Sequence, residues 1–127
     1  MSEILIADDD RRYSDSMKKV FEHEGYRVTC AHDVDSALEA MRTRSFGLIF
    51  CDYRMPGKTG LDLLEELKRV HSDIPVVMIS ACADAATENR ALELGALDLM
   101  KKPVRRRDLI DRAAVVLGGS YVESSHL

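Results

Sequence analysis

Four apolar runs of the chain each end at polar residues that could carry metal or phosphoryl chemistry. The first ends at an acidic pair, Asp8 and Asp9, and a later one ends at Asp52. A hydroxyl, Ser80, and an ammonium, Lys102, follow the last two runs. If these runs are parallel strands, their carboxyl ends meet at one edge of a sheet, where open α/β proteins bind ligands. The sequence therefore predicts three carboxylates, a hydroxyl and a lysine around a single site.

Three carboxylates gathered at one point repel each other, which makes it costly to keep all of them ionised. A divalent cation relieves that repulsion, and Mg²⁺ typically takes one or two carboxylates while leaving room for a phosphate oxygen. Asp52 could then attack phosphorus as a nucleophile and form an aspartyl phosphate. The metal and Lys102 would neutralise the transferred charge, and Ser80 could donate a hydrogen bond to it. This interpretation makes Asp52 the centre of a Mg²⁺-dependent, phosphoryl-accepting site.

Helical periodicity separates the apolar runs. In the first helix, for example, Tyr13, Met17 and Phe21 recur at helical spacing, and Asp10 is expected to cap it. Asp33 is expected to cap the second helix. Strand and helix alternate five times, which predicts a parallel sheet covered on both faces, with the second strand at an edge. The expected strands are 4–7, 26–30, 47–51, 76–79 and 97–100, and the expected helices are 10–24, 34–41, 61–68, 85–94 and 106–117.

Length and composition limit the classes of function. A chain of 127 residues, 46% hydrophobic and 31% charged, fits one ordinary globular domain. We assign 1–117 to that domain and 118–127 to a tail or linker. The net charge of −4 predicts no nucleic-acid or membrane contact, and no run is long enough to cross a bilayer. Three widely spaced cysteines and the lack of a visible signal peptide favour a reducing, cytoplasmic compartment.

Four motifs, taken together and in order, resemble the receiver domain of two-component response regulators. They are ILIADDD, FCDYRMPGKTGLDLL, VVMISA and LMKKP, and the resemblance covers residues 3–117. Any one of them alone would be a weak signal. The resemblance implies a flavodoxin-like (βα)5 fold, α/β in class, with a five-stranded parallel sheet in the order 2-1-3-4-5.

The resemblance also implies a role for each residue at the metal. Asp9 would bind Mg²⁺ directly, and Asp8 would act largely through water. Asp52 would both bind the metal and accept the phosphoryl group. The backbone carbonyl of Arg54 would complete the metal site.

On the phosphate side, the resemblance makes Ser80 the switch hydroxyl and Lys102 the lysine that contacts the phosphoryl group. The peptide bond from Lys102 to Pro103 is commonly cis in the family. Three residues before this lysine the family usually has Tyr or Phe, and here Leu99 stands there. The phosphoryl chemistry should survive that departure, whereas signalling through an aromatic rotamer cannot operate at this position.

The resemblance also implies partner proteins. The phosphoryl donor would be a phosphohistidine on a sensor histidine kinase or a histidine phosphotransfer domain. The output would come either from an effector domain beyond the C-terminus or from a stand-alone receiver acting on its partners, and a phosphorylation-dependent dimer stays open. The domain would assist its own phosphorylation and slow dephosphorylation without being an ordinary turnover enzyme.

Two other interpretations compete with this one. Phosphatases of the haloacid-dehalogenase type also form an aspartyl phosphate, but their nucleophile follows the first strand, and the chain has no cap domain to hold a substrate. A receiver-like module used only for docking, without phosphorylation, is the second alternative. The full set of acidic, hydroxyl and lysine residues argues against it, and Leu99 keeps it open.

Overall fold

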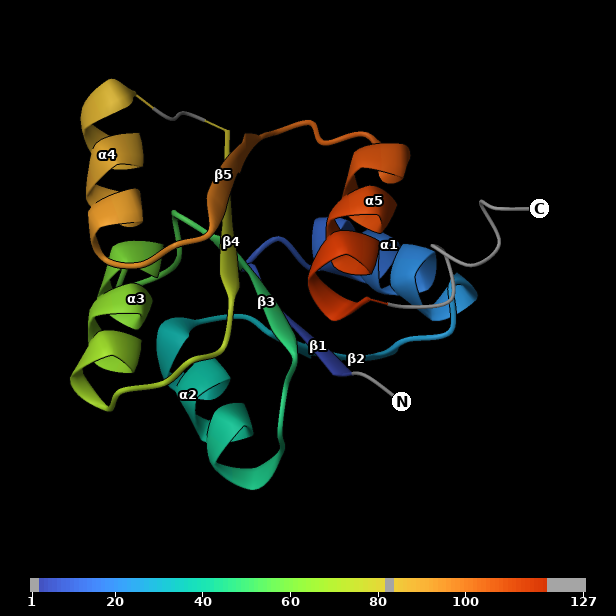
Figure 1. The fold of residues 1–127 in the computed structure, drawn as a ribbon, viewed down its shortest axis with the longest axis horizontal. Coiled ribbons are helices and arrows are strands. Elements are labelled where there is room, and N and C mark those ends of the chain that lie inside the picture. Colours follow the sequence, from blue (N-terminus) through green and yellow to red (C-terminus); the bar gives the residue numbers. More distant parts are fainter. Residues whose placement is uncertain (1–2, 82–83, 119–127) are drawn as a thin grey trace.

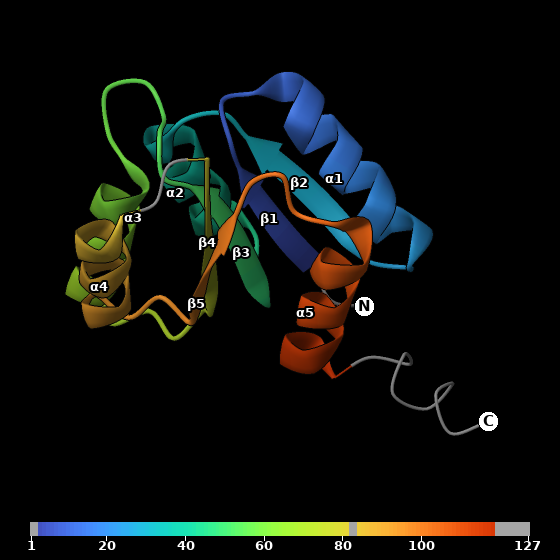
Figure 2. The ribbon, with the colours of Figure 1, turned by 90° about the horizontal axis from the view of Figure 1, so that it is seen from above.

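Short apolar runs form the strands of one parallel sheet in the computed structural model, which describes residues 3–81 and 84–118 (Figure 1, Figure 2). Each run is followed by a helix that returns the chain to the same end of the sheet. The strand order is β2-β1-β3-β4-β5, which confirms the predicted flavodoxin-like topology. The strands are β1 (Glu3–Ala7), β2 (Arg27–Ala31), β3 (Leu48–Asp52), β4 (Val76–Ser80) and β5 (Asp98–Lys101).

In the part of the chain that the structure describes, five helices cover both faces of the sheet. Helices α1 and α5 lie on one face, and α2, α3 and α4 lie on the other (Figure 1, Figure 2). This three-layer arrangement buries the central strands on both sides, as their continuous apolar sequences require. The helices are α1 (Arg11–His23), α2 (Val34–Thr43), α3 (Gly60–Arg69), α4 (Ala85–Glu93) and α5 (Arg106–Leu117).

Alternate residues of the central strands divide the interior into two clusters. The α1–α5 core lies under α1 and α5, where the rings of Phe21 and Phe50 stack with centroids 5.0 Å apart. The α2–α4 core lies on the other face and includes Leu63, Leu64 and Leu67. Both clusters draw on β1, β3 and β4, so the strands that carry the site residues are held by packing on both faces.

Four strands extend one residue beyond the predicted bounds at their carboxyl ends, and in β2 the added residue is Ala31. β3 was expected to stop at residue 51, yet it includes Asp52, which pairs with Ile79 of β4. Similarly, β4 and β5 are paired as far as Ser80 and Lys101. A polar side chain ends an apolar pattern, but the backbone can keep its ladder hydrogen bonds for one more residue. Asp52 and Ser80 therefore lie on the rigid sheet itself and not in the loops after it.

Side-chain caps begin the first two helices, as predicted. The Tyr13 N–H donates to Asp10 Oδ1 at 3.2 Å, and the Ser36 N–H donates to Asp33 Oδ1 at 2.7 Å. Each bond satisfies one of the backbone donors that a helix N-terminus leaves without an intrahelical partner. The Asp10 cap fixes the start of α1 immediately beside the acidic pair.

Replacing Asp33 with alanine is expected to lower the free energy of unfolding at neutral pH. The Ser36 N–H bond holds the pKa of Asp33 below its usual value, so the ionised carboxylate stabilises the folded state. That contribution is present above the unfolded pKa and is lost as the pH falls through the folded pKa. Urea titrations should show the Asp33→Ala deficit shrinking in strongly acidic buffer. Asp33→Asn keeps the acceptor oxygen and should retain most of the stability; equal losses in both variants at every pH would contradict the cap.

Helix α5 ends at Leu117, and Gly118 caps it in the left-handed conformation with φ of 62°. Residues 119–127, the greater part of the predicted tail, lie outside the described residues. The division of the chain at residue 117 stays a prediction. Among the described helices, none combines the length and apolar character that crossing a membrane requires.

Candidate functional site

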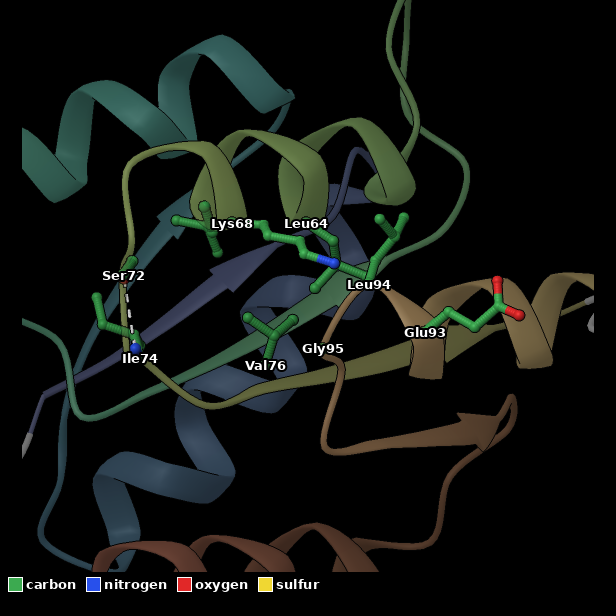
Figure 3. A pocket seen from close by; sticks show the side chains of 9 residues that line it. Leu64, Lys68, Ser72, Ile74, Val76, Glu93, Leu94 and Gly95 are labelled. Carbon is green, nitrogen blue, oxygen red and sulfur yellow. Dashed lines mark hydrogen bonds between the residues drawn. The ribbon is translucent and has the colours of Figure 1, made fainter.

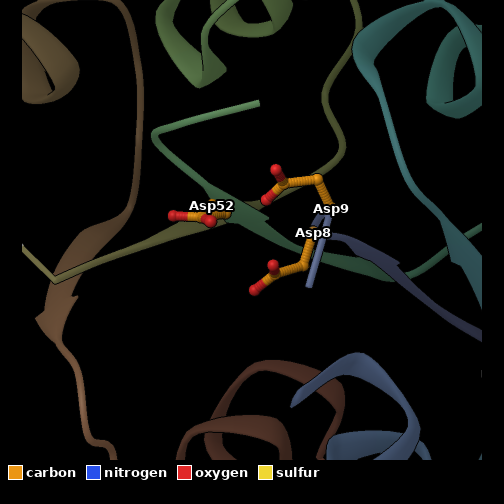
Figure 4. A group of neighbouring side chains, drawn as sticks. All are labelled: Asp8, Asp9 and Asp52. Carbon is orange, nitrogen blue, oxygen red and sulfur yellow. The ribbon is translucent and has the colours of Figure 1, made fainter. Parts of the chain in front are cut away.

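Three carboxylates meet at the carboxyl ends of β1 and β3. Asp8 and Asp9 follow β1 directly, Asp52 is the last residue of β3, and one oxygen from each lies within 4.8 Å of the others. Their carboxylates turn toward the same side of the strand ends (Figure 4). Asp8 and Asp52 are buried, with 2% and 8% of their surface exposed, whereas Asp9 is open to solvent. The predicted acidic cluster is thus assembled from segments more than forty residues apart.

Backbone hydrogen bonds extend the sheet up to these side chains. They continue the ladder just beyond the strand ends, so the site residues are anchored by main-chain contacts as well as by packing. The bonds run from the Asp8 N–H to the Ala31 carbonyl (3.0 Å), from the Tyr53 N–H to the Ile79 carbonyl (3.1 Å), and from the Lys102 N–H to the Ser80 carbonyl (2.9 Å).

Lys102 reaches into the acidic cluster from the segment after β5. Its Nζ donates to Asp8 Oδ2 at 2.9 Å and to Asp52 Oδ2 at 3.3 Å. Only 17% of the lysine side chain is exposed, so these ion pairs are partly shielded from water. The Lys102–Pro103 peptide bond is cis, as the resemblance implies. The lysine therefore lies within reach of any group attached to Asp52.

The electrostatics of the cluster reflect its crowding. Burial raises the pKa of Asp52, and the charge of Asp8 raises it further, against the opposing effect of Lys102. Burial alone would lower the pKa of Lys102, but its hydrogen bond to Asp8 and the charges of both aspartates outweigh burial and raise it. Three hard oxygen donors with this excess of negative charge fit Mg²⁺. The donor set thus agrees with the metal that the sequence predicts.

Ser80 and Arg54 occupy the expected places beside the cluster. Ser80 ends β4, is 2% exposed, and accepts the Lys102 N–H at its carbonyl. The Arg54 N–H donates to Asp52 Oδ1 at 3.4 Å, which brings the Arg54 backbone next to the acceptor. The roles of the Ser80 hydroxyl as a switch and of the Arg54 carbonyl as a metal ligand stay predictions.

Leu99 lies in the middle of β5, opposite Met78 of β4. It is partly buried and packs against the α2–α4 core. An aliphatic side chain in this place has no ring to move between a buried and an exposed rotamer. The departure noted in the sequence is therefore also a departure in the structure.

Tyr13 is the site neighbour that sequence reasoning missed. Its spacing marked it as one of several residues on the buried face of α1, yet Lys102 Nζ lies over its ring, 4.4 Å from the centroid. One signal was present: Tyr13 is three residues beyond the Asp10 cap, in the first turn of the helix that begins at the acidic pair. The first turn of this helix is the part nearest in sequence to the acidic pair, so its residues were candidates for contact with the site.

A cavity of about 200 Å³ lies elsewhere, between α3, α4 and the sheet (Figure 3). Its lining includes Val76, which begins β4, and Gly95, which precedes β5. It therefore opens at the amino ends of these strands, whereas the acidic cluster is at the carboxyl ends. The cavity contributes no residue to the carboxylate site.

Comparison with known proteins identifies the family. The sequence model of the response regulator receiver domain matches residues 4–114. The transcriptional regulatory protein CpxR of Klebsiella pneumoniae is 38% identical over 121 residues, which cover 95% of this chain and 51% of that protein. The chain thus spans about half the length of the curated CpxR relatives that it matches.

Solved structures agree with the sequence match. The receiver domain of NtrX from Brucella abortus superposes with a TM-score of 0.83 and 37% identity, covering 92% of this chain and 99% of that one. A CheY-like receiver domain protein from Methanospirillum hungatei gives a TM-score of 0.88 and 30% identity, covering 97% and 98%. Sequence, topology and the acidic cluster lead to one conclusion: the chain belongs to the response regulator receiver domain family of two-component systems.

Proposed function

We propose that this receiver domain takes a phosphoryl group onto Asp52 from a phosphohistidine of a sensor histidine kinase or phosphotransfer domain. The observation that carries the proposal is the cluster of Asp8, Asp9 and Asp52 with Lys102 bonded to two of its members. A buried carboxylate beside a lysine and two further acidic residues has the nucleophile, the metal ligands and the charge that phosphoryl transfer needs.

In the proposed step, a carboxylate oxygen of Asp52 forms a bond to phosphorus while the phosphorus–nitrogen bond of the donor breaks. The imidazole leaves with the electron pair and takes up a proton. Asp8, Asp9, Asp52 and the Arg54 carbonyl would hold Mg²⁺, whose charge offsets that of the transferred group. Lys102, already 3.3 Å from Asp52, contacts a phosphoryl oxygen and stabilises it electrostatically.

The same contacts provide a switch. When Lys102 turns from the free carboxylates to the phosphoryl group, its ion pairs with Asp8 and Asp52 change, and the Ser80 hydroxyl donates to another phosphoryl oxygen. These changes favour a second conformational population. Because Leu99 is aliphatic, we propose that the signal passes through backbone shifts in the last two βα units or through another surface of the domain. The acyl phosphate is then slowly hydrolysed within the domain.

We propose that the response to phosphorylation is produced by an effector domain or a partner protein. The CpxR relatives are about twice as long as this chain, so we propose an effector domain reached through the tail at 118–127 in a full-length protein. The domain boundary at 117 and a phosphorylation-dependent dimer belong to the same proposal. The domain itself is a switch and is expected to contact neither nucleic acid nor membrane.

Magnesium removal is expected to abolish labelling by a small phosphodonor. With acetyl phosphate and Mg²⁺, the protein should gain a hydroxylamine-sensitive phosphoryl group detectable by intact-protein mass spectrometry. Excess chelator should slow the reaction by about two orders of magnitude, because the charge of the crowded carboxylates is then uncompensated. Failure of the wild-type protein to label with Mg²⁺, together with absence of beryllofluoride binding, would favour the docking module instead.

A further inference from the structure

Tyr13 makes the third close contact to the Lys102 ammonium. Two carboxylates bind Nζ at 2.9 and 3.3 Å, and the tyrosine ring lies under it with the centroid at 4.4 Å. The face of an aromatic ring carries partial negative charge and attracts a cation, most strongly when the pair is shielded from water. With 17% of the lysine side chain exposed, this contact meets that condition.

The ring itself is fixed by the start of α1. The Asp10 N–H donates to Asp8 Oδ1 at 2.9 Å, and the Asp10 side chain in turn accepts the Tyr13 N–H at 3.2 Å. Since Lys102 also binds Asp8, the contacts form a closed circuit from Asp8 through Asp10, Tyr13 and Lys102 back to Asp8. The ring also packs against the α1–α5 core, which restricts its rotation. The Tyr13 ring is therefore held in place beside the flexible side chain of Lys102.

The hydroxyl of Tyr13 forms no hydrogen bond with the Lys102 ammonium. It is buried near the backbone of Val104, and among the described residues it makes no hydrogen bond of standard geometry. The ring, and not the hydroxyl, makes the contact that involves the site.

We propose that Tyr13 is a positioning residue that holds the Lys102 ammonium toward the phosphoryl group on Asp52. A lysine has a long stem with several rotatable bonds, and once the carboxylates are engaged by a metal its ion pairs weaken. The contact between the Tyr13 ring and the ammonium does not depend on those ion pairs. The ring therefore keeps the Lys102 ammonium near Asp52 during phosphoryl transfer. This inference rests on the proposed function of Asp52.

Tyr13→Leu and Tyr13→Phe separate the ring from the hydroxyl. Labelling by acetyl phosphate with Mg²⁺ should be about three- to tenfold slower in Tyr13→Leu, the range expected for a partly buried cation–π contact. Tyr13→Phe keeps the ring and should restore the rate to within about twofold of wild type. Tyr26→Leu removes a ring from the same core, where it packs edge-on against Phe21, and should leave the rate unchanged.

Two further measurements distinguish positioning from a structural role. The ring should shift the Lys102 ε-methylene protons upfield in the nuclear magnetic resonance spectrum of wild type and Tyr13→Phe, but not of Tyr13→Leu. In a Lys102→Ala background, Tyr13→Leu should change the labelling rate by less than about twofold, because its effect passes through the missing ammonium.

The inference and the proposed function fail in different ways. If wild type does not label, or labels at a residue other than Asp52, the proposed function is wrong. If wild type labels on Asp52 while Tyr13→Leu labels at the same rate, Tyr13 does not position the lysine. An equal loss in the Lys102→Ala background would also overturn the inference, because Tyr13 would then support the site without acting through Lys102.

Discussion

Replacing Asp52 with asparagine is expected to reduce labelling by acetyl phosphate to background. The amide has nearly the same shape as the carboxylate, but it lacks the charged oxygen that attacks phosphorus and binds a cation. Mass spectrometry after a long incubation should show the unmodified chain, whereas wild type carries the added phosphoryl mass. Asp73→Asn, at an exposed aspartate in the loop before β4, is the matched control and should label normally.

The same variant is expected to be at least as stable as wild type in the absence of metal. Because burial and Asp8 raise the pKa of Asp52, the folded protein binds that proton more tightly than the unfolded chain does. Stability therefore falls as the pH rises from the unfolded to the folded pKa, and the full penalty is present above it. Asparagine removes this penalty, so its urea midpoint above that interval should equal or exceed that of wild type. Undiminished labelling of a folded Asp52→Asn protein would refute Asp52 as the acceptor.

Gly60→Ala is expected to lower the free energy of unfolding by about 2 kcal/mol, as overpacking in a closely packed interior does. Gly60 begins α3, and a Cβ on it would lie 2.6 Å from the Asp52 carbonyl oxygen and 2.6 Å from Met78 Cε. The methionine tip can move, but the carbonyl belongs to β3 and cannot move without shifting the acceptor itself. Urea unfolding should show the loss of stability, and acetyl phosphate labelling should slow in the same variant.

Gly47→Ala is the matched control for that clash. Its added Cβ would lie 2.7 Å from Leu117 Cδ2, a similar distance, but this neighbour is the end of a flexible side chain. The leucine can change rotamer, and alanine also reduces the freedom of the unfolded chain, so the cost should be below about 1 kcal/mol. Equal costs at the two glycines would show that contact with the β3 backbone is not what makes Gly60 necessary.

The sequence alone predicts the α/β class of the fold and most of the polar residues that the structure brings together at one edge of the sheet. A continuous apolar run suits a strand that is covered on both faces, as in the middle layer of an α/β sandwich, and four such runs lead to polar residues. The carboxyl ends of parallel strands share one edge of the sheet. Asp8, Asp52 and Lys102 follow such ends, so they were expected to lie close together. The caps at Asp10 and Asp33 were equally predictable, because capping depends on contacts only three residues apart.

The contacts, burial and pKa values of those residues follow only from the tertiary structure. The lysine ammonium reaches Asp8 across 94 residues of sequence and Asp52 across 50, and no local pattern gives the distances of such contacts. The same holds for the burial of Asp8 beside an exposed Asp9, and for the raised pKa of Asp52. Tyr13 shows the limit most clearly: helical spacing placed it on the buried face of α1, whereas its contact with Lys102 exists only because α1 and the segment after β5 pack at the same edge of the sheet.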